Sequence, residues 1–136
     1  MTLTVKVISP DQTVLNSTAD EVILPSSTGQ LGVLTDHAPL ITALDAGVIR
    51  FRRDRDWATV AVSSGFAEIE DNEVAVLVRS AQLGVDIDAE AARTELTAAE
   101  ERLAGIKEDD KQGKILAEQD LRLARARLQA TTNVWF

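Results

Sequence analysis

The apolar residues of this chain follow two different periods, and the change from one to the other lies near Gly84. Before Gly84, apolar and polar residues alternate in short runs, which is typical of half-buried β-strands. In the first run, for example, Leu3, Val5 and Val7 fall on one face. After Gly84 the apolar residues recur at steps of three and four, as on one side of an α-helix. The pattern therefore predicts a β-module followed by a helical part.

The β-module is predicted to contain many short strands separated by turn residues. The expected strands are residues 3–8, 13–18, 21–24, 30–34, 39–44, 47–52, 57–64, 66–70 and 73–78. Residues 54–56 are expected to form one hairpin loop, and Asp71 and Asn72 the turn of another, because Asp and Asn tolerate the backbone angles of tight turns. Short strands at this spacing indicate a β-sandwich or a barrel.

The helical part is predicted to be two antiparallel helices joined by a polar loop. The first helix begins after Asp88, a residue type that caps helix N-termini, and stops at Gly105. The loop over residues 106–113 ends in Gly113, and the second helix ends at residues 131–133. The apolar seams of the two helices are Ala89, Ala92, Leu96, Ala99 and Leu103, and Ala117, Leu121, Ala124 and Leu128. The expected fold class is α+β: a β-sandwich over residues 1–85 and a helical hairpin over residues 86–136.

Both helical seams consist mostly of alanine, which limits how firmly the hairpin can be held. A buried methylene group contributes about 0.8 kcal/mol, so an alanine in place of leucine loses most of the stabilisation that burial provides. Each seam has only two leucines. We therefore expect the hairpin to pack weakly on the sandwich and to be able to leave it.

The charge of the chain is acidic and unevenly placed. With 22 acidic and 14 basic residues, its net charge is -8, which argues against nucleic-acid binding because that function needs a basic face. Residues 86–110 carry 9 acids and 3 bases, whereas residues 111–136 carry 2 acids and 5 bases. We expect the two helices to attract each other.

Candidate catalytic and metal-binding groups are scarce in this sequence. There is no cysteine, and His37 is the only histidine, so we expect it to be a loop residue in a structural hydrogen bond. Gly29 and Gly32 lack the Gly-Lys-Ser/Thr ending of a phosphate-binding loop. We expect no catalytic residue, metal ligand or cofactor. The remaining alternatives are a free-standing ligand-binding β-module with a helical lid, which would have a deep pocket, and, more remotely, a hydrolase.

Four segments, in order along the chain, resemble the epsilon subunit of F-type ATP synthases. The most specific is TGQLGVLTDHAPL at residues 28–40, and the others are residues 9–11, 21–25 and 65–69. The resemblance continues into the helical hairpin and is strongest to the cyanobacterial and chloroplast branch. It implies a non-catalytic central-stalk subunit that links the gamma subunit to the membrane ring of c subunits. It also implies a hairpin that inhibits ATP hydrolysis when it extends toward the catalytic alpha and beta subunits.

The resemblance suggests partner-binding residues and a location. Arg122, Arg125 and Arg127 would face an acidic stretch of a beta subunit, although a solvated helix face explains them equally well from composition. His37 and Leu40 lie in the signature segment and are candidate partner contacts. With neither a signal peptide nor a membrane-spanning run, the expected place is peripheral, on the cytoplasmic or stromal face of an energy-transducing membrane such as the thylakoid.

Two features of the helical part bear on its ligands. Some bacterial relatives bind ATP through an Ile/Leu-Asp-x-x-Arg-Ala motif, but here Ala91 stands in place of the arginine. ATP binding by this chain is therefore not expected. The ending Val134, Trp135 and Phe136 is either a frayed terminus or an aromatic plug for a partner pocket.

Overall fold

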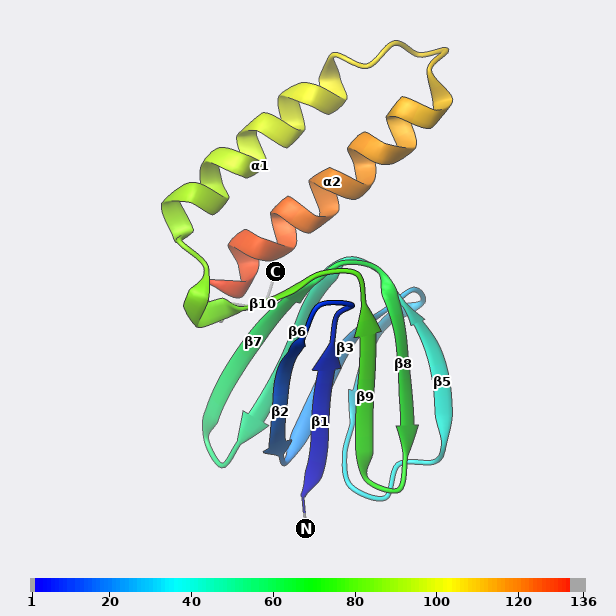
Figure 1. Cartoon of the computed structure of the whole chain (residues 1–136), viewed down its shortest axis with the longest axis vertical. Coiled ribbons are helices and arrows are strands. Elements are labelled where there is room, and N and C mark those ends of the chain that lie inside the picture. The colour runs from blue at the N-terminus through cyan, green and yellow to red at the C-terminus, as the bar shows by residue number, and fades with distance from the viewer. Residues whose placement is uncertain (1, 133–136) are drawn as a thin grey trace.

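The computed structural model describes residues 2–132, and the three apolar residues at the end of the chain lie outside this range. A compact body of β-strands forms the first part, and two helices lie together at one end of it (Figure 1). This arrangement confirms the predicted α+β fold class. We call the strands and their turns the sandwich, and the two helices with their loop the arm.

The sandwich contains ten strands within the described residues. They are β1 (Leu3–Ile8), β2 (Thr13–Ala19), β3 (Glu21–Ser26), β4 (Gly29–Val33), β5 (Leu40–Leu44), β6 (Gly47–Arg53), β7 (Asp56–Val62), β8 (Gly65–Glu70), β9 (Glu73–Val78) and β10 (Ala81–Leu83). Nine of them match predicted strands to within one or two residues. The alternation of apolar and polar residues did not indicate β10, because three residues are too few to show a period.

The strands are joined edge to edge in the order β10-β7-β6-β3-β5-β8-β9-β1-β2, with β4 paired to β3. Only one residue pair, Ser26 with Leu44, connects β3 to β5, so the strands divide there into two layers. All neighbouring strands are antiparallel except β1 and β9, which are parallel. The two layers face each other across one core.

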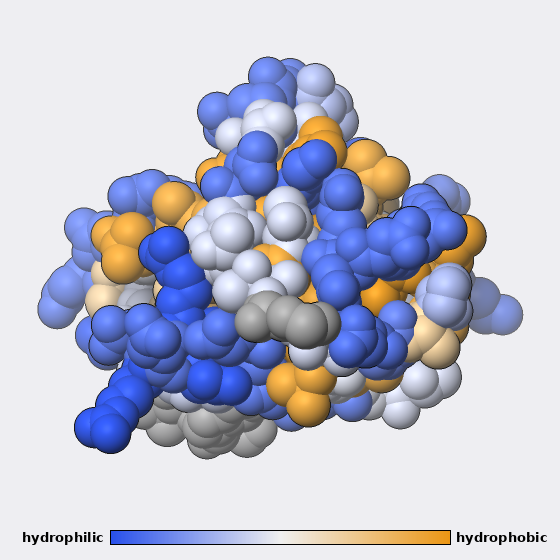
Figure 2. Space-filling view, turned by 90° about the horizontal axis from the view of Figure 1, so that it is seen from below, coloured by the Kyte–Doolittle hydropathy of each residue, from blue (hydrophilic) through white to orange (hydrophobic). Residues whose placement is uncertain are grey.

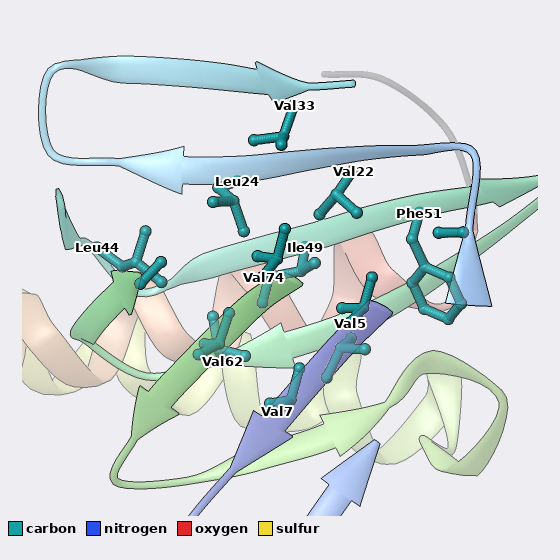
Figure 3. Close-up of a cluster of buried hydrophobic side chains, with 14 of the residues drawn as sticks. Val5, Val7, Val22, Leu24, Val33, Leu44, Ile49, Phe51, Val62 and Val74 are labelled. Atoms are coloured by element: carbon teal, nitrogen blue, oxygen red, sulfur yellow. The ribbon is translucent and has the colours of Figure 1, made fainter. Parts of the chain in front are cut away.

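The core is filled by the inward-facing residues of both layers (Figure 3). Leu3, Val5 and Val7 are fully buried, as their alternation predicted, and the large buried residues of the facing layer include Leu24 and Ile49. Most of these side chains are β-branched, which suits the pleated surface of a strand. The burial of apolar area in this core is the main stabilising contribution to the sandwich.

Tight turns close the end of the sandwich that lies away from the arm. Asp54, Asp71 and Asn72 all have positive φ angles, so both predicted hairpin turns are confirmed. Asn72 also accepts a hydrogen bond from the backbone N–H of Asp36 at 2.6 Å, which ties two loops together. Asp and Asn reach this backbone region at less cost than other non-glycine residues.

The arm consists of α1 (Ala89–Ala104) and α2 (Lys111–Ala130), after a short 3-10 turn, η1 (Gly84–Asp86). Asp88 caps α1 by accepting hydrogen bonds from two backbone N–H groups, and Gly105 follows its last turn, as predicted. The expected loop over residues 106–113 is too long, because α2 already begins at Lys111. The carboxylate of Asp110 caps it by accepting a hydrogen bond from Gly113 at 2.9 Å, so Gly113 belongs to the first turn.

The arm contacts the sandwich through α2. In Figure 1, α1 lies along α2 on the side away from the strands, while α2 packs on β6 and β7. The predicted seams are confirmed, since their inner alanines are buried and their leucines are half-buried. A second buried face of α2, formed by Ala126 and Ala130, meets the sandwich and was not predicted.

Candidate functional site

An apolar patch lies on the outer face of β5, β8 and β9. Ile41, Phe66 and Leu77 are 71%, 59% and 54% exposed, and we call these three residues the side patch. Phe66 and Leu77 are direct partners in the β8–β9 register, and Ile41 lies on β5, beside β8. Exposed apolar patches on otherwise polar proteins commonly mark interaction surfaces. This patch was not predicted from the sequence, although Phe66 at an outward position of an alternating strand indicates it.

A groove of about 740 Å³ continues the side patch toward the arm. Its lining includes Phe66 and Leu77 together with Ile8, Pro10 and Gly65. The groove is shallow and open to solvent, unlike the enclosed pockets that bury most of a small ligand. Its shape suits the edge or helix of a partner protein better than a small molecule.

The same outer face becomes acidic toward the end away from the arm. Glu68, Glu70 and Glu73 line a hollow there, and only Glu73 has a cationic neighbour among the described residues, Lys6 at 3.2 Å. Together with the side patch, this gives a surface that is apolar near the arm and negative farther from it. Such a surface complements a partner that presents apolar and basic side chains side by side.

The two candidate residues of the signature segment lie at the end of the sandwich remote from the arm. His37 is half-buried, and its Nδ1 atom lies 2.6 Å from the carbonyl oxygen of Ala38, which confirms the structural hydrogen bond expected of it. Leu40 is 38% exposed and pairs with the buried Ile69, so it lies on the core side of β5, not in the side patch. Figure 2 shows this end of the molecule as largely hydrophilic, with small separate apolar areas. The role of His37 and Leu40 in partner binding stays a prediction.

The three arginines of α2 do not form one group. Arg122 and Arg125 are exposed, and neither forms an ion pair with any other described residue. Arg127 is only 26% exposed in its side chain, and its Nε atom donates a hydrogen bond to Oε2 of Glu95 on α1 at 3.0 Å. It also donates a hydrogen bond to the Gln82 side chain on β10. With the arm in this position, Arg122 and Arg125 are open to a partner while Arg127 is engaged within the chain.

The arginines Arg50 and Arg52 of β6 differ in burial, although their spacing places both on one face of the strand. Arg50 is buried. It lies opposite Thr59 in the β6–β7 register, on the side of the sheet where α2 packs. Burial lowers the pKa of the Arg50 guanidinium from its usual value. Arg52 remains partly exposed and lies 3.4 Å from the Glu21 carboxylate.

The end of α2 meets the sandwich at a very close contact. Thr59 Oγ1 on β7 donates a hydrogen bond of 2.5 Å to the carbonyl oxygen of Ala130, and both residues are buried. A Cβ atom on Gly84 would overlap both of these oxygens, so only glycine fits beside them. A hydrogen bond of this kind contributes about 1 kcal/mol net. Sequence reasoning identified Gly84 only as the point where the pattern changes.

The start of α1 differs from a nucleotide-binding arrangement. Ala91, which stands at the position of the motif arginine, is exposed. Arg93, two residues later, forms a loose ion pair with Glu90 at 3.9 Å. Among residues 2–132, no group of three or more His, Asp or Glu side chains is arranged to hold a metal ion. No helix in that range has the length and apolar character needed to cross a bilayer.

Comparison with known proteins gives matches to both parts of the chain. Residues 2–84 match the family model described as ATP synthase, Delta/Epsilon chain, beta-sandwich domain, and residues 86–132 match its long alpha-helix domain. The ATP synthase epsilon chain of Synechococcus elongatus is 60% identical over 130 residues, covering 96% of this chain and 95% of the relative. That of Thermosynechococcus vestitus is 54% identical over 135 residues, covering 98% of each chain.

A solved structure shares the fold. A chain of the Euglena gracilis mitochondrial ATP synthase (OSCP/F1/c-ring) superposes with a TM-score of 0.76 at 20% identity, covering 92% of this chain and 78% of that one. At this identity the likeness concerns the fold. The identity to the epsilon chains and the two consecutive family matches carry the assignment, and the chain therefore belongs to the delta/epsilon chain family of ATP synthases.

Proposed function

We propose that this chain is the epsilon subunit of the central stalk in a rotary proton-translocating ATP synthase. It is non-catalytic, and it couples proton flow to ATP synthesis by linking the gamma subunit to the c-ring. The observation that carries the proposal is the 60% identity to an ATP synthase epsilon chain over 96% of the chain, spanning both the sandwich and the arm. We expect the sandwich and the arm to have the same separate roles in this chain as in the relatives that match over both parts.

The sandwich, residues 1–85, is the part that holds the rotor. The side patch and its open groove supply the apolar surface for gamma, and the acidic area beside them suits basic side chains of the same partner. The opposite, hydrophilic end carries His37 and Leu40 and faces the c-ring in this proposal. These surfaces are spread over rigid strands, so the sandwich can transmit torque without changing its shape.

The arm, residues 86–136, is the regulatory part. In this proposal it leaves the sandwich, extends along gamma and blocks ATP hydrolysis at the alpha and beta subunits. Arg122 and Arg125 are exposed on α2 and support contact with an acidic segment of beta through charge-assisted hydrogen bonds. Arg127 can join them only after its contacts with Glu95 and Gln82 break.

The location follows from the assembly. The subunit is peripheral on an energy-transducing membrane, held there through the complex. The cyanobacterial relatives support the cytoplasmic face of the thylakoid, or the stromal face in a chloroplast, as the finer location. ATP is not expected to regulate this subunit directly, because Ala91 supplies no charge for a phosphate.

The alternative function, a ligand-binding module with a helical lid, requires an enclosed pocket beneath the arm. The hollow between α2 and the sandwich has a volume of about 540 Å³ and is lined in part by polar side chains such as Arg79, Gln119 and Asp120. The groove of about 740 Å³ on the open outer face, beside the side patch, is larger and more apolar. This observation favours a protein partner.

Truncation after Val85 tests the division of labour. We expect the shortened chain to keep its affinity for gamma, because the side patch and the core are intact. We also expect ATP hydrolysis by the reassembled complex to rise above that of the complex with the full chain. Loss of gamma binding by a truncated chain that still shows the strand signal in circular dichroism would contradict the proposed division.

A further inference from the structure

The buried apolar contact between the arm and the sandwich lies near the last turns of α2. The apolar contact there consists of Ala61, Ile87, Ala92 and Ala130, with Val48 and Leu128 packed at its margin. Half of these residues are alanines, which bury little area each. Helix α1 packs mainly on α2, and Ala92 near its start reaches the cluster that holds Ala61 of the sheet (Figure 1). The burial of apolar area alone therefore stabilises the docked arm only weakly. Polar contacts then determine how long the arm stays docked.

Two polar contacts occur at this same end of α2. The first is the hydrogen bond from Thr59 Oγ1 to the carbonyl oxygen of Ala130. That oxygen belongs to the last helical turn, where carbonyl groups have no partner within the helix. The second is made by Arg127, which joins α2 to Glu95 of α1 and to Gln82 of β10. The three elements are thus connected through one guanidinium group.

Gly84 makes the first contact possible. It lies where the sandwich ends and the arm begins, and it is the residue beside both Thr59 Oγ1 and the Ala130 oxygen. A Cβ atom there would come within 3.0 Å of both oxygens, so a side chain would push the end of α2 away. Because Gly84, between the sandwich and the arm, has no side chain, the end of α2 can approach Thr59 closely.

We propose that Thr59, Gly84 and Arg127 form a latch that sets the balance between the docked and the released arm. The latch rests on the proposed function only for its effect on ATP hydrolysis, since the contacts exist in the isolated chain. Because both polar contacts lie at one end of α2, they open together when that end moves. When the arm is released, the Thr59 hydroxyl, the Ala130 carbonyl and the Arg127 guanidinium become accessible to water. Breaking these contacts therefore leaves none of the three groups buried without a partner.

Thr59 and Gly84 of the latch are separate from the arginines proposed to meet the catalytic subunits, and Arg127 can join those arginines only after the latch opens. Arg127 lies two positions after Arg125, so successive 100° rotations place it on a different side of α2. Arg122 and Arg125 stay exposed in the docked arm, whereas Arg127 is half-buried. Changes at Thr59 or Gly84 should therefore alter how often the arm is released without altering the residues it presents.

The test uses the full chain with spin labels at cysteines that replace Arg55, in the sandwich, and Lys107, in the arm loop, both exposed. The chain has no cysteine of its own, so labelling is specific. We expect one main distance in the parent. Thr59→Val loses the hydrogen bond and should shift the docking equilibrium toward release by about fivefold, the factor that corresponds to a bond of about 1 kcal/mol. Thr59→Ser keeps the hydroxyl group and should retain the parent distance.

Gly84→Ala should shift the equilibrium further, because the added methyl group overlaps the docked α2. Gly32→Ala is its matched control, since a Cβ atom there meets nothing within 4 Å. Thr59→Val keeps the shape of the side chain, so it carries the test if Gly84→Ala fails to fold. A Thr59→Val chain with the parent distance distribution would overturn the latch.

Hydrolysis by the reassembled complex gives a second and separate readout. If Thr59→Val shifts the distances and strengthens inhibition, the latch and the inhibitory arm both stand. If it shifts the distances and leaves hydrolysis unchanged, the latch stands and the proposed inhibitory function fails. If the distances do not shift, the latch fails whatever the hydrolysis rate.

Discussion

Phe66 and Leu77 lie directly opposite each other on β8 and β9, with both side chains exposed on the outer face of the sandwich. A directly paired Phe and Leu on a strand surface cover each other in part but still leave a broad apolar area in water. A partner that covers this pair would bury its apolar area, and that burial would stabilise the complex. The pair is therefore the place to test gamma binding.

Phe66→Ser should weaken binding to gamma by about tenfold to a hundredfold, which corresponds to a loss of about 1.4–2.8 kcal/mol, a usual cost of truncating a central apolar anchor. Titration of labelled gamma with the variant measures the change. Val85→Ser is the matched control, since Val85 is 89% exposed but lies outside the side patch. Equal losses in the two variants would mean that the side patch is not the gamma surface.

Arg122→Gln combined with Arg125→Gln should relieve inhibition of ATP hydrolysis in the reassembled complex. Both side chains are exposed without an ion pair among the described residues, so the free energy of unfolding should change by less than about 0.5 kcal/mol. Hydrolysis rates at low and high salt measure the effect, because a charge-based contact weakens with ionic strength.

Arg93→Gln is the control for the arginine variant, as Arg93 is exposed on α1. Inhibition that survives the double change on α2, or that falls equally with Arg93→Gln, would remove the specific role of Arg122 and Arg125.

Ile69→Ala should lower the free energy of unfolding of the sandwich by about 2–5 kcal/mol, the usual cost of a cavity in a close-packed core. Ile69 is almost fully buried, whereas Ile41, on the neighbouring strand, is exposed. Ile41→Ala should therefore have little effect. Chemical denaturation of both variants measures the difference, and similar costs would contradict the inward and outward assignment of these strands.

Asp88→Ala should reduce the helix content of the arm and cost about 1 kcal/mol, because its carboxylate accepts hydrogen bonds from the N–H groups of Glu90 and Ala91. Amide exchange of α1 measures the effect, and exchange in the sandwich strands should not change. Asp88→Asn keeps an oxygen acceptor and should behave like the parent. Uniformly faster exchange in both parts would mean that the arm and the sandwich unfold as one unit.

Much of the fold could be predicted from local pattern. Strict alternation, as at Leu3, Val5 and Val7, identified the strands, and the three- and four-residue steps identified both helical seams. Asp88 and Gly105 marked the ends of α1 because their effects act within one helical turn. The start of α2 was misplaced because Gly113 was interpreted as a linker, although it sits in the first turn under the capping Asp110.

The features that local pattern did not reveal depend on long-range contacts. The parallel pairing of β1 with β9, and the contact of Thr59 with Ala130, join residues about seventy positions apart. The side patch forms only when β5, β8 and β9 are brought together. The candidate arginines were identified from charge alone, and only the folded arm separates the engaged Arg127 from the exposed Arg122 and Arg125.

A covalent bridge between the arm and the sandwich would show whether the arm must leave the sandwich in order to inhibit ATP hydrolysis. Ser80 and Gln119 line the same groove between the sandwich and α2, so cysteines at these positions can be joined by a short bismaleimide. We expect the bridged chain to bind gamma like the parent and no longer to inhibit ATP hydrolysis in the reassembled complex. Full inhibition by the bridged chain would contradict a mobile inhibitory arm, because the arm would then act without leaving the sandwich.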